Sequence, residues 1–130
     1  MIFYLDTSAW IAWKFKQAGS DIFKKIALDS DTVISCPLFV SEYVSFLKRN
    51  EILSQTRYEE ELDFIRWIFP AVPLFKEYSQ CGKLGFLRGA DLYHIATALW
   101  FAQDRPSELI FLTCDLKQKE AAKKLGFKTP

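Results

Sequence analysis

The chain has 130 residues, of which 50% are hydrophobic and 16% aromatic, so it carries ample core-forming material for one small domain over residues 1–130. A domain of this size buries about 70% of its unfolded surface. The formal net charge of +1 shows no overall attraction to nucleic acid, so any such role must depend on a local arrangement of charges. The three cysteines include no C-x-x-C pair, which argues against a disulfide framework or a zinc knuckle. With neither a signal-peptide pattern nor ~18 consecutive apolar residues, we expect a cytoplasmic protein without membrane contact.

Three short apolar runs predict buried strands. They are residues 2–5 (IFYL), 32–36 (TVISC) and 109–113 (LIFLT), each bounded by polar residues. Continuous apolar runs are typical of strands that are covered on both faces. Residues 71–75 are a weaker candidate, because Pro73 restricts them to an edge or a bend. Residues 127–129 are predicted to form a short final edge strand.

Helical periodicity predicts helices between these runs. The expected helices cover residues 8–17, 21–28, 37–50, 55–69, 75–84, 89–103 and 116–125. Pro37 suits a first helical position, because its missing N–H would be unpaired there, and Gly126 suits the C-terminal cap of the last helix. Strands that alternate with helices predict a three-layer α/β/α fold with a central, mostly parallel sheet.

Four acidic residues occupy related places in this predicted fold. Asp6 directly follows the first strand, and Asp115 follows the strand at 109–113 after one residue. Glu42 lies in the second turn of the helix after the second strand, and Asp91 lies in the first turn of the helix at 89–103. Ligands of parallel α/β sheets bind beyond the carboxyl ends of the strands. We therefore predict that the four carboxylates meet at one edge of the sheet.

Simpler explanations exist for individual acids. Asp6 could cap the helix that follows it, and Asp91 would be favourable at a helix N-terminus for electrostatic reasons alone. Glu42 has no capping role, and Phe39 and Phe46 place it within or beside the buried stripe of its helix. For Glu42 the alternative is a buried ion pair with Arg49 or Lys48.

Four clustered carboxylates need a positive partner, because two of them ~4 Å apart repel by about 4 kcal/mol at an effective dielectric of 20. A hard divalent cation, Mg²⁺ or Mn²⁺, prefers such oxygen ligands and would serve phosphoryl transfer. Supporting hydroxyls are predicted from Thr7, Ser8 and Thr113. Candidate contacts to substrate phosphates, chosen because they flank the acidic motifs, are Lys14, Lys16, Lys83 and Arg88.

His94 is the single histidine of the chain and lies three residues after Asp91. Ribonucleases that use no metal usually need a pair of acid and base groups, which one histidine cannot supply. We interpret His94 as a supporting or packing residue.

Four sequence stretches resemble the PIN-domain ribonucleases, especially the VapC-type toxins of bacterial and archaeal toxin–antitoxin pairs. They are YLDTSA, SEY, GADLYHIATAL and LTCDLKQKEAAKKLGF, which occur in the family's order over nearly the whole chain. The resemblance implies an α/β/α endoribonuclease that depends on Mg²⁺ or Mn²⁺. It implies that Asp6, Glu42, Asp91 and Asp115 form the acidic cluster, with Thr113 or Ser8 in support. It also implies a homodimer and an antitoxin that blocks the site.

Two other readings stay open at this point. One is a phosphatase or receiver-like module with Asp6 as phosphoacceptor. The phosphatase would need a second acid two residues later, where the chain has Ser8, and the receiver would need a paired acid and a late lysine that the sequence does not place. The other is a catalytically inactive PIN-like binding scaffold, against which the four intact acids argue.

Overall fold

A computed structural model describes residues 1–18, 21, 26 and 31–130. Its sheet contains the strands β1 (Ile2–Leu5), β2 (Thr32–Ser35), β3 (Ile65–Trp67) and β4 (Leu109–Leu112) in the order β3-β2-β1-β4. All three pairings are parallel, with Phe3 of β1 opposite Val33 of β2 and Ile110 of β4. The carboxyl ends of the strands therefore share one edge, as the fold prediction requires.

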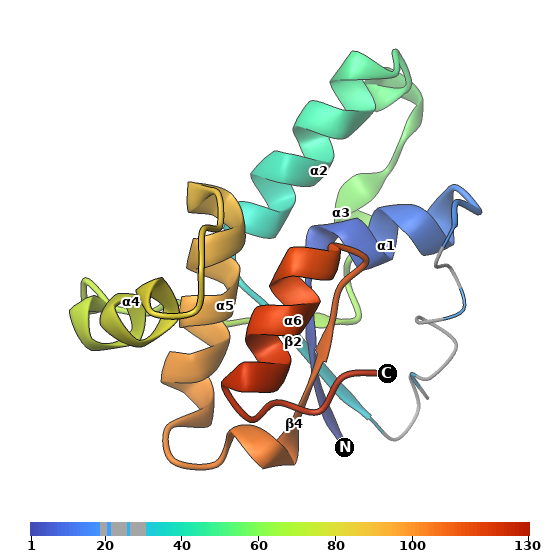
Figure 1. Cartoon of the computed structure of the whole chain (residues 1–130). Helices are drawn as coiled ribbons and strands as arrows, with labels where there is room; N and C mark the ends of the chain where they lie inside the picture. Colours follow the sequence, from blue (N-terminus) through green and yellow to red (C-terminus); the bar gives the residue numbers. More distant parts are fainter. Residues whose placement is uncertain (19–20, 22–25, 27–30) are drawn as a thin grey trace.

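Six α-helices are described together with two short 3₁₀ helices. They are α1 (Thr7–Lys14), α2 (Leu38–Arg49), η2 (Leu53–Gln55), α3 (Tyr58–Glu61), α4 (Phe75–Gly82), α5 (Gly89–Ala102), η3 (Pro106–Glu108) and α6 (Leu116–Lys124). Figure 1 shows α5 and α6 side by side over the sheet. Among the described residues, no helix has the length and apolar character that crossing a membrane requires.

The alternation of side chains along β1 separates two cores. Phe3 and Leu5 pack with Trp10 of α1 and Tyr43 of α2 on one face of the sheet. Tyr4 points to the other face, into a cluster formed largely by α4, α5 and α6. Because successive strand residues point to opposite faces, a strand with helices on both sides is apolar throughout. The predicted three-layer α/β/α fold with a parallel sheet is confirmed.

Most of the predicted elements are found, with small changes at their ends. The strand at 2–5 is confirmed in full, and those at 32–36 and 109–113 are one residue shorter. Pro37 lies one position before the first residue of α2 and not at it. Gly126 ends α6 with a φ of 96°, and Lys128 forms an isolated parallel bridge with Ile110 in place of a final strand. The expected helix at 21–28 falls largely outside the described residues.

Two predictions were wrong. The helix expected over 55–69 is replaced by α3 and the strand β3, because Ile65 pairs with Val33 and is buried against the core below α2. The strand considered at 71–75 is absent from that described stretch. Leu74 there has a φ of 60° and precedes α4. For Ile65–Trp67, pairing with the free edge of β2, which no local pattern reports, decided the outcome.

Candidate functional site

Asp6 is held at the junction of β1, β4 and α1. Its N–H donates to the carbonyl oxygen of Leu112 (2.9 Å), which extends the pairing of β1 with β4 by one residue. Its carboxylate accepts a hydrogen bond from the N–H of Ser8 (3.1 Å), which caps α1. The capping role suggested by the sequence is therefore present, and it leaves Asp6 only 3% exposed at the end of the central strand.

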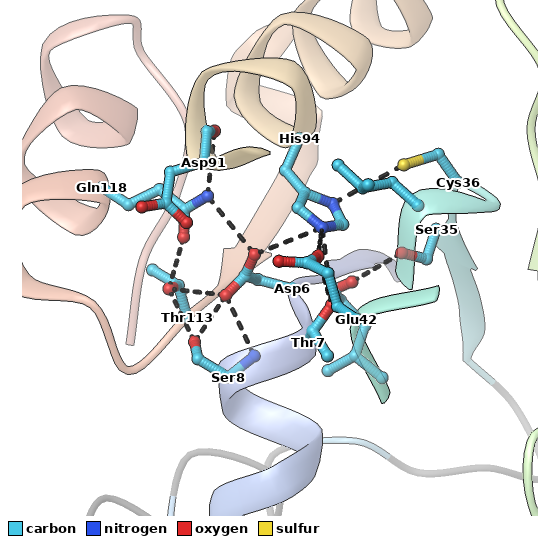
Figure 2. Close-up of polar contacts among 12 residues, drawn as sticks. Asp6, Thr7, Ser8, Ser35, Cys36, Glu42, Asp91, His94, Thr113 and Gln118 are labelled. Atoms are coloured by element: carbon cyan, nitrogen blue, oxygen red, sulfur yellow. Dashed lines mark hydrogen bonds and ion pairs between the residues drawn. The ribbon is translucent and has the colours of Figure 1, made fainter. Parts of the chain in front are cut away.

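Side chains from α1, from the residue directly after β4 and from α6 complete the surroundings of Asp6 (Figure 2). Asp6 Oδ2 accepts a hydrogen bond from the Ser8 hydroxyl (2.5 Å) and lies 3.2 Å from the Thr113 hydroxyl. Asp6 Oδ1 accepts from the side-chain amide of Gln118 (3.3 Å). The same Gln118 accepts from the Thr113 hydroxyl (2.6 Å) and is fully buried. Ser8 and Thr113 thus lie beside the acid as predicted, whereas Gln118 was not foreseen.

Asp91 and Asp115 lie at the starts of α5 and α6. Asp115 accepts a hydrogen bond from the N–H of Gln118 (2.9 Å) and caps α6. Gln118 also donates to the carbonyl oxygen of Asp91 (3.1 Å), which ties the two helix starts together. Burial raises the pKa of Asp91, and the carboxylates of Asp6 and Asp115 raise it further. These three acids are therefore close enough to repel one another.

Glu42 reaches the site from α2 and is paired with His94 of α5. His94 Nε2 lies 2.5 Å from Glu42 Oε1 and 3.7 Å from Asp6 Oδ1. The hydroxyl of Thr7, also one of the predicted supporting groups, donates to Glu42 Oε1 (2.9 Å). The His94 side chain has no exposed surface, and that of Glu42 is 30% exposed. The structure thus shows a partly buried ion pair for Glu42, with His94 as its partner in place of Arg49 or Lys48.

The other nitrogen of His94 faces the interior. Nδ1 lies 2.8 Å from the hydroxyl of Tyr4 and 3.6 Å from the sulfur of Cys36. Burial alone would lower the pKa of His94, but its hydrogen bonds with Cys36 and Glu42 outweigh burial and raise the pKa from 6.5 to about 10. Burial likewise would raise the pKa of Glu42, but the hydrogen bond and charge of His94 lower it. This shift favours the imidazolium form of His94, which would supply positive charge to the acids.

The four predicted acids line one cavity of about 660 Å³ at the carboxyl edge of the sheet. Its lining includes Asp6, Ser8, Glu42, Arg49, Arg88, Asp91 and Asp115. Burial of the acids is graded, from Asp6 in the interior to the half-buried Glu42, Asp91 and Asp115. The prediction that the four carboxylates meet at one edge agrees with this placement. Their catalytic roles stay a prediction.

The basic residues are distributed less closely around this cavity. Arg88 lines it, with its Nε 3.7 Å from Asp91 Oδ2. Lys14 pairs with Glu61 (2.6 Å), and Lys83 lines a different cavity, beside α4 and α5. Lys16 is exposed just after α1. Arg49 was predicted only as an alternative partner of Glu42. It lines the acidic cavity, whereas none of the three lysines does.

The carboxylates of the cavity can be compared with the ligands that a divalent cation needs. Within the part of the chain that the structure describes, no three His, Cys, Asp or Glu side chains are as closely spaced as the ligands of one ion. Mg²⁺ needs only one or two carboxylates and keeps several waters, and the mutual repulsion seen at Asp91 is the condition that a cation would relieve. The carboxylate oxygens of Asp6, Asp91 and Asp115 are therefore suitable ligands for an ion whose coordination shell is completed by waters.

Comparisons with known proteins agree with this fold. The family model of the PIN domain matches residues 3–124. A crystal structure of VapBC2 from Rickettsia felis, bound to a DNA fragment from the promoter, is similar with a TM-score of 0.70 and 13% sequence identity. That similarity covers 100% of this chain and 98% of the other, and at this identity it concerns the fold. A search of curated proteins found no match. Since the family match runs from β1 to the end of α6, and so through all four acids, this chain belongs to the PIN-domain family.

Proposed function

We propose that this protein is an endoribonuclease that depends on Mg²⁺ or Mn²⁺. The observation that carries the proposal is the convergence of Asp6, Glu42, Asp91 and Asp115 on one cavity of a PIN domain. Capping explains Asp6 and Asp115 one at a time, but it does not explain why acids from four separate segments share a cavity. A set of carboxylates that repel one another is suited to a hard cation and a phosphate substrate.

The chain's own residues would divide the work as follows. Together, Asp6, Glu42, Asp91 and Asp115 would hold the cation and orient the attacking water, and the bound cation would supply activation of water and stabilisation of developing charge. Ser8 and Thr113 orient the Asp6 carboxylate through the contacts described above. Arg88 and Arg49 line the same cavity and would bind phosphates of the RNA backbone.

The products should carry 5′-phosphate and 3′-hydroxyl ends, as the resemblance to PIN-domain ribonucleases implies. Attack by the 2′-hydroxyl would instead leave cyclic phosphates and would need an acid–base pair near pH 7. His94, the single histidine, is fully buried and ion-paired, so it is badly placed for that chemistry.

We further propose that the protein is the toxin of a toxin–antitoxin pair, acting in the cytoplasm as one PIN-like domain over residues 1–130. The four motifs that resemble VapC-type toxins support this, and so does the likeness of fold to VapBC2. Exposed rings suit a partner surface or a homodimer, because Phe69, Phe75 and Phe86 are 67%, 76% and 78% exposed. A short neighbouring gene with a DNA-binding amino terminus would identify the antitoxin.

The test is to incubate purified protein, free of antitoxin, with structured RNAs in Mn²⁺, Mg²⁺ or chelator and to map the ends. Asp6→Asn and Asp91→Asn should lower the rate by about 10²-fold or more, because each removes a charged ligand. Asp63→Asn is the matched control, since Asp63 is exposed and lies outside the cavity. Cleavage that persists in chelator, or that survives Asp6→Asn, would contradict the proposal.

A further inference from the structure

We infer that His94 is a positioning residue that fixes Glu42 beside Asp6 and so sets the arrangement of the acid cluster. The inference rests on the proposed nuclease function and deepens it. Because the imidazole has no exposed surface, His94 cannot touch RNA in the cavity, and any effect it has on the reaction must pass through other residues.

The first step is the geometry on the cavity side of the ring. His94 Nε2 approaches Glu42 Oε1 (2.5 Å) and Asp6 Oδ1 (3.7 Å), so one ring atom lies near two carboxylates, one from α2 and one from the end of β1. Figure 2 shows His94 and Gln118 on either side of Asp6. Gln118 ties Asp6 to α5 and α6, whereas His94 ties it to Glu42 of α2. The two buried side chains hold different halves of the cluster.

The second step is the orientation of the ring itself. Nδ1 lies 2.8 Å from the Tyr4 hydroxyl, and the Tyr4 ring stacks on Phe111 with centroids 5.2 Å apart and planes 3° apart. Tyr4 is fully buried in β1. The ring of His94 is therefore locked by the central strand, and Nε2 has one direction in which to point.

The third step is the dependence of Glu42 on this contact. Its side chain is 30% exposed, so a free carboxylate could turn toward water at the mouth of the cavity, away from Asp6. Repulsion between the two carboxylates favours that rotation. The contact with His94, aided by the Thr7 hydroxyl, opposes it. Loss of the Nε2 contact should therefore displace Glu42 while leaving Asp6, Asp91 and Asp115 in place.

Two substitutions separate positioning from packing. The amide nitrogen of Gln is as many bonds from Cα as Nε2, so His94→Gln keeps a donor toward Glu42. The amide nitrogen of Asn is as many bonds from Cα as Nδ1, so His94→Asn keeps a polar group toward Tyr4 and loses the donor toward Glu42. Both remove the ring, so a role in packing alone predicts similar losses for the two variants.

The experiment measures kcat and KM for RNA cleavage in Mn²⁺, and Mn²⁺ affinity by calorimetry without RNA. His94→Asn should lower kcat or Mn²⁺ affinity by about 10- to 100-fold, as removal of groups that support metal ligands does, with KM for RNA unchanged. His94→Gln should recover most of the loss. The double variant His94→Asn with Glu42→Gln should be no worse than Glu42→Gln, because both changes act on one carboxylate. Tyr4→Phe, which keeps the stacked ring, should show a smaller loss of the same kind even if His94→Asn fails to fold.

The outcomes distinguish this inference from the proposed function. If wild type cleaves RNA, Asp6→Asn abolishes cleavage, and His94→Asn equals wild type, the function stands and the inference is overturned. Equal losses in His94→Asn and His94→Gln, or additive effects with Glu42→Gln, would also overturn it. A wild-type protein that binds Mn²⁺ but cleaves no RNA would refute the function, while the affinities of the two His94 variants would still decide the inference. Without Mn²⁺ binding, both fail.

Discussion

Raising the pH of the metal-free protein should leave His94 protonated until about pH 10. Its pKa in the folded chain lies above the unfolded value of 6.5, so folding is stabilised in full below pH 6.5 and the stabilisation is lost as the pH rises through about 10. The interval of about 3.5 pH units, at about 1.4 kcal/mol per unit, corresponds to about 5 kcal/mol of unfolding free energy. This figure is an upper bound, because the Glu42 side chain of the pair is 30% exposed and water screens it.

Four groups that face His94 set this behaviour. Glu42 and Asp6 face Nε2, and Tyr4 and Cys36 face Nδ1. Burial would raise the pKa of Cys36, but the hydrogen bond and charge of His94 lower it, so the titration of this thiol is coupled to that of His94. The variant Cys36→Ser separates the two titrations.

The assay is a proton NMR titration of the untagged protein in chelator from pH 5 to pH 10.5. The chain has one histidine, so the Cε1–H resonance of the imidazole needs no assignment. Chemical denaturation over the same range, for wild type and His94→Gln, measures the accompanying free energy. A wild-type midpoint between pH 6 and 7, or equal pH dependence in the two proteins, would refute the ion-pair reasoning.

Three further predictions concern the metal, the helix cap and the assembly. The melting temperature should rise when Mn²⁺ or Mg²⁺ is added. At an ion concentration of 100 times Kd, the free energy of unfolding should increase by about 2.7 kcal/mol. Asp91→Asn should remove this rise and increase metal-free stability by relieving repulsion, and a wild-type melting curve that ignores both ions would contradict the cluster. Asp115→Asn keeps an acceptor for the cap of α6 and should lose only RNA cleavage. Asp115→Ala should in addition lower the free energy of unfolding by about 1 kcal/mol, measured by chemical denaturation. Equal stability of the two variants would contradict the capping role of Asp115. Light scattering should show a homodimer, and a strict monomer at high concentration would count against it.

The parts of the fold that were predictable are those fixed by local pattern. Continuous apolar runs identified β1, β2 and β4, and the rule for carboxyl ends of parallel strands then grouped Asp6 with Asp115. The short β3 was missed because Ile65–Trp67 is a strand only through its pairing with β2. Its partners Val33 and Ile65 are 32 residues apart in the sequence, so no local pattern reports the pairing.

The supporting residues of the site were predicted less well than its acids. His94 was predicted to be a supporting or packing residue, and its charge depends on Glu42, Asp6 and Cys36, which come from other elements. The available signal was the need of four carboxylates for a positive partner, a role for which a metal was predicted. Gln118 lies in a lysine-rich stretch, and only the tertiary structure shows that it is fully buried.

The strand order β3-β2-β1-β4 also constrains when the site can form during synthesis. β1 is made first, yet one of its two edges stays open until β4 has been made, and Asp6 has neither Thr113 nor Gln118 until then. Contacts between such distant parts of a chain form late, because loop closure must precede them. A chain that is still growing on the ribosome therefore lacks the assembled acid cluster until the residues up to Gln118 have emerged. For an enzyme proposed to cut RNA, that delay would keep the unfinished protein inactive beside its own message.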